Sequence, residues 1–150
     1  MPRAPRPMTP ATIPTELIID SSIVAAWFLP DERSPVAERV LSALSDLKLS
    51  APMLLKAEFA NVLTRAFRRR QTDSKLLDRL LDDFDRLPIR YETLSLNTAD
   101  LVRGALRHLL TPYDFVYLDL AIRTRLPLAT LDPELAAAAT RAGLAVITDS

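Results

Sequence analysis

Four acidic residues stand where the sequence could build a catalytic site. Asp20 ends the apolar run ELIID and Asp132 ends the apolar run LATLD, and a stretch with helical spacing follows each. Asp114 lies three residues after Thr111, at the start of another helical stretch, and Glu58 lies inside MLLKAEFANVLTRAFRRR. Carboxylates hold hard divalent cations and move protons, so these four positions are the candidate catalytic groups.

Each acid also has a purely structural explanation. Asp is a preferred N-cap residue, so Asp20 and Asp132 would serve equally well to start a helix. Asp114 has the Thr-x-x-acid spacing of a capping box. Glu58 gains nothing as a cap in the middle of a helix, and its structural alternative is a surface pair with Arg65, worth at most about 0.5 kcal/mol.

The four acids make more sense together than separately. Three helix starts and one helix side can aim four carboxylates into one crevice, and such a cluster of anions is stable only if a cation neutralises it. Oxygen ligands without His or Cys favour Mg²⁺ or Mn²⁺. The sequence therefore predicts a divalent metal site formed by Asp20, Glu58, Asp114 and Asp132.

The scarce residue types exclude other chemistries. There is no Cys, which excludes a disulfide framework, a thiolate zinc site and a Cys nucleophile. A single His excludes two-His metal motifs, and two Gly are too few for a Walker loop or a GxGxxG turn. Nineteen basic residues balance nineteen acidic ones, so attraction for an anionic partner depends on local charge.

The elements that would position the acids alternate along the chain. Apolar or alternating runs predict strands over 16–20, 48–51, 89–94, 127–131 and 144–148. Helical spacing predicts helices over 22–29, 34–46, 52–70, 74–86, 97–110, 111–125 and 133–143. This alternation predicts an α/β fold with a mostly parallel sheet covered on both faces. Sites in such folds form outside the carboxyl ends of the strands, where the strand order reverses.

Residues 16–150 are predicted to form one domain, because they contain no linker, repeat or low-complexity tract. Residues 1–15 carry five prolines and lack the apolar stretch of a signal peptide, which predicts a disordered N-terminal extension. No apolar run reaches the roughly 18 residues that span a bilayer. We therefore expect a cytoplasmic protein without a membrane association.

The stretches around the acids resemble the PIN-domain ribonucleases, and within that family the VapC-type toxins of bacterial toxin–antitoxin modules. The matching stretches, in the family's order and spacing, are IDSSIVAAWFLPDE (19–32), AEFANVL (57–63), LTPYDFVYLDLA (110–121) and LATLDPEL (128–135). The resemblance implies a PIN-like α/β/α sandwich with about five strands. It also implies an Mg²⁺- or Mn²⁺-dependent endoribonuclease that acts as a toxin.

The resemblance assigns individual residues and partners as well. It places the four acids on the family's metal-binding positions, with Asn61 as an orienting residue and Thr130 as a small polar residue beside the last acid. We expect Asp20 and Asp114 to be the principal ligands. Asp119 stands where the family has a small apolar residue, and we expect it to pair with Arg123 outside the site. The family further implies a homodimer and a small VapB-like antitoxin whose C-terminal tail fills the active groove.

Basic residues gather at the end of the helix that carries Glu58. Arg65, Arg68 and Arg69 would contact an RNA backbone there, and Arg65 is the best candidate because it shares the stripe of Glu58. The helix dipole favours cations at this end in any case, so the cluster also has a structural explanation.

Two other functions remain open from the sequence. One is phosphoryl transfer on a receiver-like or dehalogenase-like fold with Asp20 as the nucleophile. Against it, Asp20 is followed by Ser-Ser rather than by the second Asp of a DxD pattern, and no Lys ends a late strand. The other is a non-catalytic, PIN-like binding module, which has no positive support because all four acids are present.

Overall fold

Five parallel strands form the centre of the molecule. The computed structural model describes residues 13–70 and 73–149. The strands are β1 (Glu16–Ile19), β2 (Lys48–Pro52), β3 (Ile89–Glu92), β4 (Leu128–Ala129) and β5 (Val146–Ile147). They lie in the order β3-β2-β1-β4-β5, and every neighbouring pair is parallel. The predicted five-stranded parallel sheet is confirmed.

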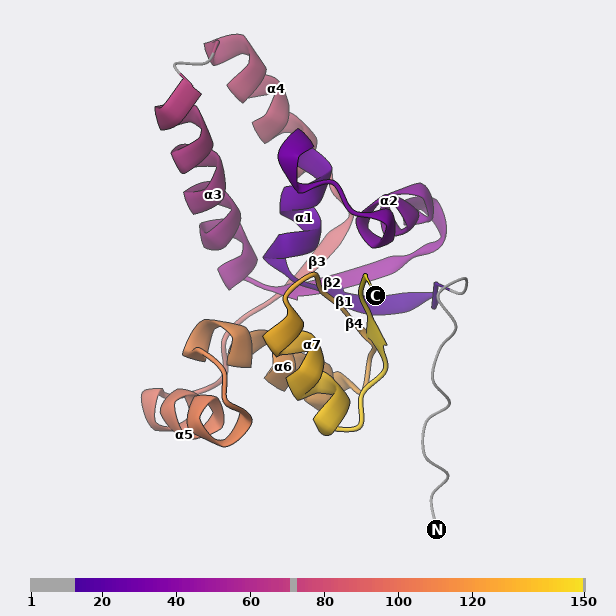
Figure 1. The fold of residues 1–150 in the computed structure, drawn as a ribbon, viewed down its shortest axis with the longest axis vertical. Helices are drawn as coiled ribbons and strands as arrows, with labels where there is room; N and C mark the ends of the chain where they lie inside the picture. Colours follow the sequence, from indigo (N-terminus) through magenta and orange to yellow (C-terminus); the bar gives the residue numbers. More distant parts are fainter. Residues whose placement is uncertain (1–12, 71–72, 150) are drawn as a thin grey trace.

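Helices cover the sheet on both sides. They are α1 (Ser21–Phe28), α2 (Pro35–Ser42), α3 (Leu54–Arg70), α4 (Ser74–Asp85), α5 (Thr98–His108), α6 (Pro112–Thr124) and α7 (Pro133–Arg141), with short 3₁₀ turns η1 (Pro30–Glu32) and η2 (Leu44–Asp46). In Figure 1, α1 to α4 lie on one side of the sheet and α5 to α7 on the other. The predicted α/β/α arrangement is therefore confirmed.

Two predicted helix boundaries were wrong. The long helix was expected to begin at Pro52, but Pro52 is still part of β2, where it pairs with Glu92 of β3, and α3 begins at Leu54. The helix expected over 34–46 ends at Ser42 and continues as the 3₁₀ turn η2. Strand pairing thus delays the start of α3, and turn geometry ends α2 before its apolar periodicity does.

The core explains why the first strand reads as an unbroken apolar run. Leu17, Ile18 and Ile19 are all 0% exposed, since helices cover both faces of the sheet. Tyr117 and Leu118 of α6 are buried against the same core, at 1% and 0% exposed. The helix that carries Asp114 is thus anchored directly to the centre of the domain.

The strand order reverses between β1 and β4. From β1 the chain moves to β2 and β3 on one side, and it then returns to place β4 and β5 on the other side of β1. Asp20 directly follows β1, and Thr130 directly follows β4. The predicted site residues therefore lie at the reversal point, where open α/β sheets bind their ligands.

The folded domain begins before residue 16. Ile13 packs against the hydrophobic core, and the Thr15 carbonyl accepts a hydrogen bond of 2.9 Å from the Lys48 amide. Residues 1–12 of the predicted N-terminal extension lie outside the described residues. Within the described parts of the chain, no helix combines the length and apolar character needed to cross a bilayer.

Candidate active site

Asp20 is the most deeply buried of the four acids. Its Oδ1 accepts hydrogen bonds from the amides of Ser22 (3.0 Å) and Ile23 (3.3 Å) and from the Ser22 hydroxyl (2.5 Å), so it caps α1. Its Oδ2 accepts from the Thr130 hydroxyl at 2.5 Å. The side chain is only 4% exposed, and this burial raises the pKa of Asp20 from 3.8 to about 6 although its hydrogen bonds oppose the shift.

The turn after β4 is tied to the turn after β1. The buried Thr130 hydroxyl accepts from the Asp132 amide at 3.0 Å, and the Ser22 hydroxyl accepts from the Leu131 amide at 2.9 Å. Asp132 in turn caps α7, with its Oδ1 accepting from the Glu134 amide at 2.8 Å. These bonds hold two aspartates that are far apart in the sequence at one edge of the sheet.

Asp114 faces those two aspartates from the first turn of α6. Thr111 caps this helix by accepting a hydrogen bond of 3.1 Å from the Asp114 amide. The carboxyl groups of Asp114 and Asp132 lie within hydrogen-bonding reach of each other. Burial raises the pKa of Asp114 to about 6, and the negative charges of Asp132 and Asp20 add to the rise.

Glu58 approaches the same point from α3, on the other side of the sheet. Its Oε1 accepts a 2.5 Å hydrogen bond from the hydroxyl of Tyr117 on α6. Burial raises the pKa of Glu58, the Tyr117 bond lowers it, and the charge of Asp114 raises it further. Glu58 is half-buried, and its pKa responds to the charge of another carboxylate, so it is not a solvated surface residue.

The structure thus brings all four predicted acids into one electrostatic neighbourhood. Their oxygen-only donor set and mutual repulsion suit a hard divalent cation. The ligand set is not ready-made, because among the described residues no three His, Cys, Asp or Glu side chains are arranged to hold a metal ion. The fold gathers the acids, and their mutual repulsion contributes to the raised pKa of Asp114, whereas burial alone raises the pKa of Asp20.

Comparison with known proteins agrees with this geometry. A model of the PIN domain matches residues 17–141, which include all four acids. The chain belongs to the PIN-domain family. Ribonuclease VapC3 of Pyrobaculum aerophilum is 34% identical over 125 residues, covering 81% of this chain and 92% of that protein. The predicted resemblance to VapC-type PIN domains is therefore confirmed.

Solved structures share the fold of this PIN domain. A chain of VapBC2 from Rickettsia felis, solved bound to a DNA fragment from its promoter, gives a TM-score of 0.61 at 13% identity, covering 90% of this chain and 99% of that chain. FitAcB from Neisseria gonorrhoeae gives 0.58 at 17% identity, covering 87% and 95%. At these identities the likeness concerns the fold, which is not the receiver-like or dehalogenase-like alternative.

Structural and chemical interpretations of the aspartates in this PIN domain coexist. Asp20 and Asp132 do cap helices. Both capping bonds of Asp132 go to its Oδ1, so its Oδ2 takes no part in the cap. The three aspartates all lie at helix N-termini, where backbone dipoles favour negative charge. A cap position is therefore a way of aiming a carboxylate at the site.

The structure also locates two other residues of the PIN domain that were singled out from the sequence, Asn61 and Asp119. Asn61 is exposed one turn after Glu58 on α3. Asp119 pairs with Arg123, with 2.8 Å between Oδ2 and Nε, as expected.

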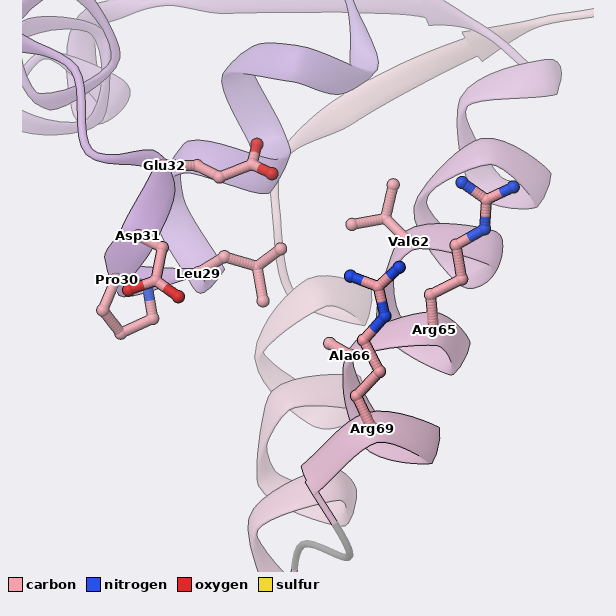
Figure 2. Close-up of a pocket in the computed structure, with 8 residues that line it drawn as sticks. All are labelled: Leu29, Pro30, Asp31, Glu32, Val62, Arg65, Ala66 and Arg69. Carbon is pink, nitrogen blue, oxygen red and sulfur yellow. The ribbon is translucent and has the colours of Figure 1, made fainter.

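The three predicted RNA-contacting arginines are split between two grooves. Arg65 and Arg69 line a groove of about 290 Å³ between α3 and η1. Figure 2 shows them on the α3 wall, with Asp31 and Glu32 on the opposite wall. Arg68 instead lines an apolar groove between α3 and α4. The three arginines predicted from the sequence to form one cluster therefore lie on two different sides of α3.

Two site residues of the PIN domain were missed from the sequence. Ser22 holds Asp20, and its position two residues after an N-cap aspartate was the available signal. Tyr117 holds Glu58, and it lies three residues after Asp114, on the same helix face. Helical spacing placed Tyr117 beside Asp114 but gave no sign that it would reach a carboxylate on another helix.

Proposed function

We propose that this PIN domain is a metal-dependent endoribonuclease that hydrolyses RNA phosphodiester bonds as the toxin of a toxin–antitoxin pair. The observation that carries the proposal is the convergence of Asp20, Glu58, Asp114 and Asp132 at the reversal point of the sheet. The relative named Ribonuclease VapC3 supports the same activity. A non-catalytic binding module would not need acids gathered so closely that the charges of Asp20 and Asp132 raise the pKa of Asp114, and that of Asp114 raises the pKa of Glu58.

The donor set assigns roles to the acids around Mg²⁺ or Mn²⁺. Asp20 and Asp114 would be the principal ligands, Glu58 would bind directly or through water, and Asp132 would be an outer ligand or serve a second ion. When bound, the ion lowers the pKa of a water molecule and stabilises negative charge on the phosphate. The protein's own contribution is to keep Asp20 fixed through Ser22 and Thr130.

One arginine groove suits the RNA backbone better than the other. Arg65 and Arg69 follow Glu58 by seven and eleven residues, which places each of them within about 20° of Glu58 around α3 and about 10 and 16 Å from it along the helix. Phosphates leading to the cleavage site would run along this side. Arg68 lines the α3–α4 groove instead, so we expect it to contribute less.

The toxin function requires partners. A small VapB-like antitoxin would bind the domain and block the acids. This proposal is supported by VapBC2 of Rickettsia felis, a solved structure of the same fold whose name joins VapB and VapC. Exposed apolar side chains on α5, at its C-cap and on α6 suit a homodimer contact, and they are Val102, Leu106, Leu109 and Tyr113. An RNA substrate implies action in the cytoplasm.

Cleavage of labelled RNA by the purified protein tests the proposal. We expect cutting with Mg²⁺ or Mn²⁺ and none with EDTA. Asp114→Asn should fold normally and lose at least 100-fold in cleavage rate. Binding of RNA without cleavage by the wild-type protein in any divalent metal would favour the binding-module alternative, and wild-type activity in Asp114→Asn would refute the assigned site.

A further inference from the structure

A hydrogen bond between two side chains joins the two helical layers at the site. The hydroxyl of Tyr117 on α6 donates to Oε1 of Glu58 on α3, with 2.5 Å between the two oxygens and 59 residues between them in the chain. The Tyr117 side chain is only 1% exposed, so its ring is fixed by the core. The bond therefore connects a rigid group to the carboxylate of a long, half-buried side chain.

The burial of Tyr117 makes this bond consequential for both partners. A buried phenol hydroxyl needs a hydrogen-bond partner, and here a carboxylate provides it. Hydrogen bonds to a charged acceptor are the strong ones, and they restrict the acceptor's orientation. Glu58, with three side-chain torsions, would otherwise be the least constrained acid, because the three aspartates sit at helix N-termini.

The position of Tyr117 also links it to the other acids. It lies one helical turn after Asp114, so α6 carries both a candidate ligand and the group that holds Glu58. Its hydroxyl is close enough to respond to the charge of Asp20 as well, and the Ser21 hydroxyl lies beside it. Tyr117 therefore lies next to the group of acids and not in a remote part of the core.

We propose that Tyr117 is a positioning residue that holds the Glu58 carboxylate in the orientation used for the divalent ion. This inference rests on the proposed function. It assigns to Tyr117 a role that operates through Glu58 alone, without contact between the phenol and the RNA. The competing explanation is that the hydroxyl only stabilises the packing of α6 against α3.

A double-mutant cycle separates the two explanations. Tyr117→Phe removes the hydroxyl and keeps the ring, while Glu58→Gln keeps an acceptor for the hydroxyl and removes the charge. We expect Tyr117→Phe to weaken Mn²⁺ binding, followed by electron paramagnetic resonance, 10- to 100-fold. kcat for RNA should fall with little change in KM, and the double variant should be no worse than Glu58→Gln, because Tyr117 acts only through Glu58.

Further variants guard against a trivial result. Tyr91→Phe removes the hydroxyl of a different tyrosine, which is partly buried on β3, and should leave Mn²⁺ binding unchanged. Glu58→Asp keeps the charge but shortens the side chain, so it tests the same contact from the half-buried partner if Tyr117→Phe fails to fold. It should weaken Mn²⁺ binding as much as Tyr117→Phe.

Three outcomes overturn the inference. A lower melting temperature in Tyr117→Phe, with Mn²⁺ affinity and kcat at wild-type values, would show that the hydroxyl has a packing role alone. Losses that multiply in the double variant would show that Tyr117 acts independently of Glu58. A wild-type Mn²⁺ affinity in Glu58→Asp would show that the contact is dispensable. If Asp114→Asn binds Mn²⁺ and cleaves like wild type, the proposed function itself fails, which is a different result.

Discussion

The buried hydroxyl of Thr130 connects the two strand ends of the site. Thr130 is 0% exposed, donates to Asp20 and accepts from the Asp132 amide. Without it, the buried carboxylate of Asp20 would lose a donor that favours its charged form. The hydroxyl thus stabilises both the fold and the ionised state of the acid.

Replacing Thr130 tests this role. Thr130→Val keeps the shape and removes the hydroxyl, leaving the Asp20 carboxylate and the Asp132 amide without that partner, so we expect a loss of about 1–3 kcal/mol in the free energy of unfolding. Urea denaturation of the metal-free protein measures it. Thr140→Val is the control, because its hydroxyl bonds only to its own helix at an exposed site, and it should cost less than about 0.5 kcal/mol. Equal effects in both variants would contradict the assigned role.

The raised pKa values of Asp20 and Asp114 predict a pH dependence. A carboxyl whose pKa is about 6 when folded and 3.8 when unfolded binds its proton more tightly in the folded state. Its stabilising contribution is present below about 3.8 and is lost as the pH rises through about 6. The metal-free protein should therefore lose stability from these two groups between pH 4 and pH 7.

The variant Asp114→Asn isolates one of the two groups, since Asn does not titrate. The free energy of unfolding of the variant minus that of wild type should become more positive as the pH rises from about 4 to about 7. Urea unfolding of both proteins at matched pH values measures the difference and cancels the titrating groups that do not interact with Asp114, while the lost charge also lowers the pKa of Glu58 and acts in the same direction. A difference that is flat with pH would show that the site does not raise the pKa of Asp114.

At the scale of elements, α6 is positioned by its contact with α5. Gly104 of α5 faces Phe115, the residue after Asp114, and a Cβ at Gly104 would overlap the Phe115 ring. The ring also stacks on His108, with 5.7 Å between ring centroids. Glycine is required here by close approach, and this approach sets the distance of α6 from its neighbour.

Gly104→Ala should therefore disturb both stability and the site. Overpacking predicts a loss of about 1–3 kcal/mol in the free energy of unfolding and weaker Mn²⁺ binding, because Phe115 moves together with Asp114. Thermal unfolding and a Mn²⁺ titration measure the two effects. Adding Phe115→Leu should recover part of the stability, and a Gly104→Ala protein as stable as wild type would refute this account of the helix contact.

The two faces of α3 predict different effects for its arginines. Arg65→Gln and Arg69→Gln should each weaken RNA binding and lower the slope of log affinity against log salt by about 0.7, the value for one phosphate contact on a single strand. Arg68→Gln should change neither, since it lines the other groove. Fluorescence anisotropy in the Asp114→Asn background measures binding without cleavage. An effect of Arg68→Gln as large as the others would remove the distinction between the grooves.

At the scale of the whole molecule, the sequence predicted the layers better than the contacts. Apolar runs that end in an acid located β1 and β4, because strands buried on both faces leave such runs. The rule for parallel sheets then placed Asp20 at the reversal point, where the structure has it. Local periodicity was therefore enough to assign the fold class and to place the strand-end aspartates Asp20 and Asp132 at one edge of the sheet.

Side-chain contacts across layers could not be predicted in the same way. Nothing in the spacing of Tyr117 and Glu58 indicates that they meet, because their contact depends on how α3 and α6 pack at the edge of the sheet. The separation of Arg68 from Arg65 depends on the position of α4. Pro52 ended up in a strand because β3 pairs with it, although its sequence context favoured a helix start.

The central claim is that the fold gathers four carboxylates to bind a divalent ion, and calorimetric titration of the metal-free protein with Mn²⁺ at pH 7 tests it most directly. We predict saturable binding of Mn²⁺ to the wild-type protein. Binding should be at least tenfold weaker in Asp114→Asn, provided that this variant is folded like the wild-type protein. An absence of saturable binding up to millimolar Mn²⁺, or equal affinity in the two proteins, would contradict the account.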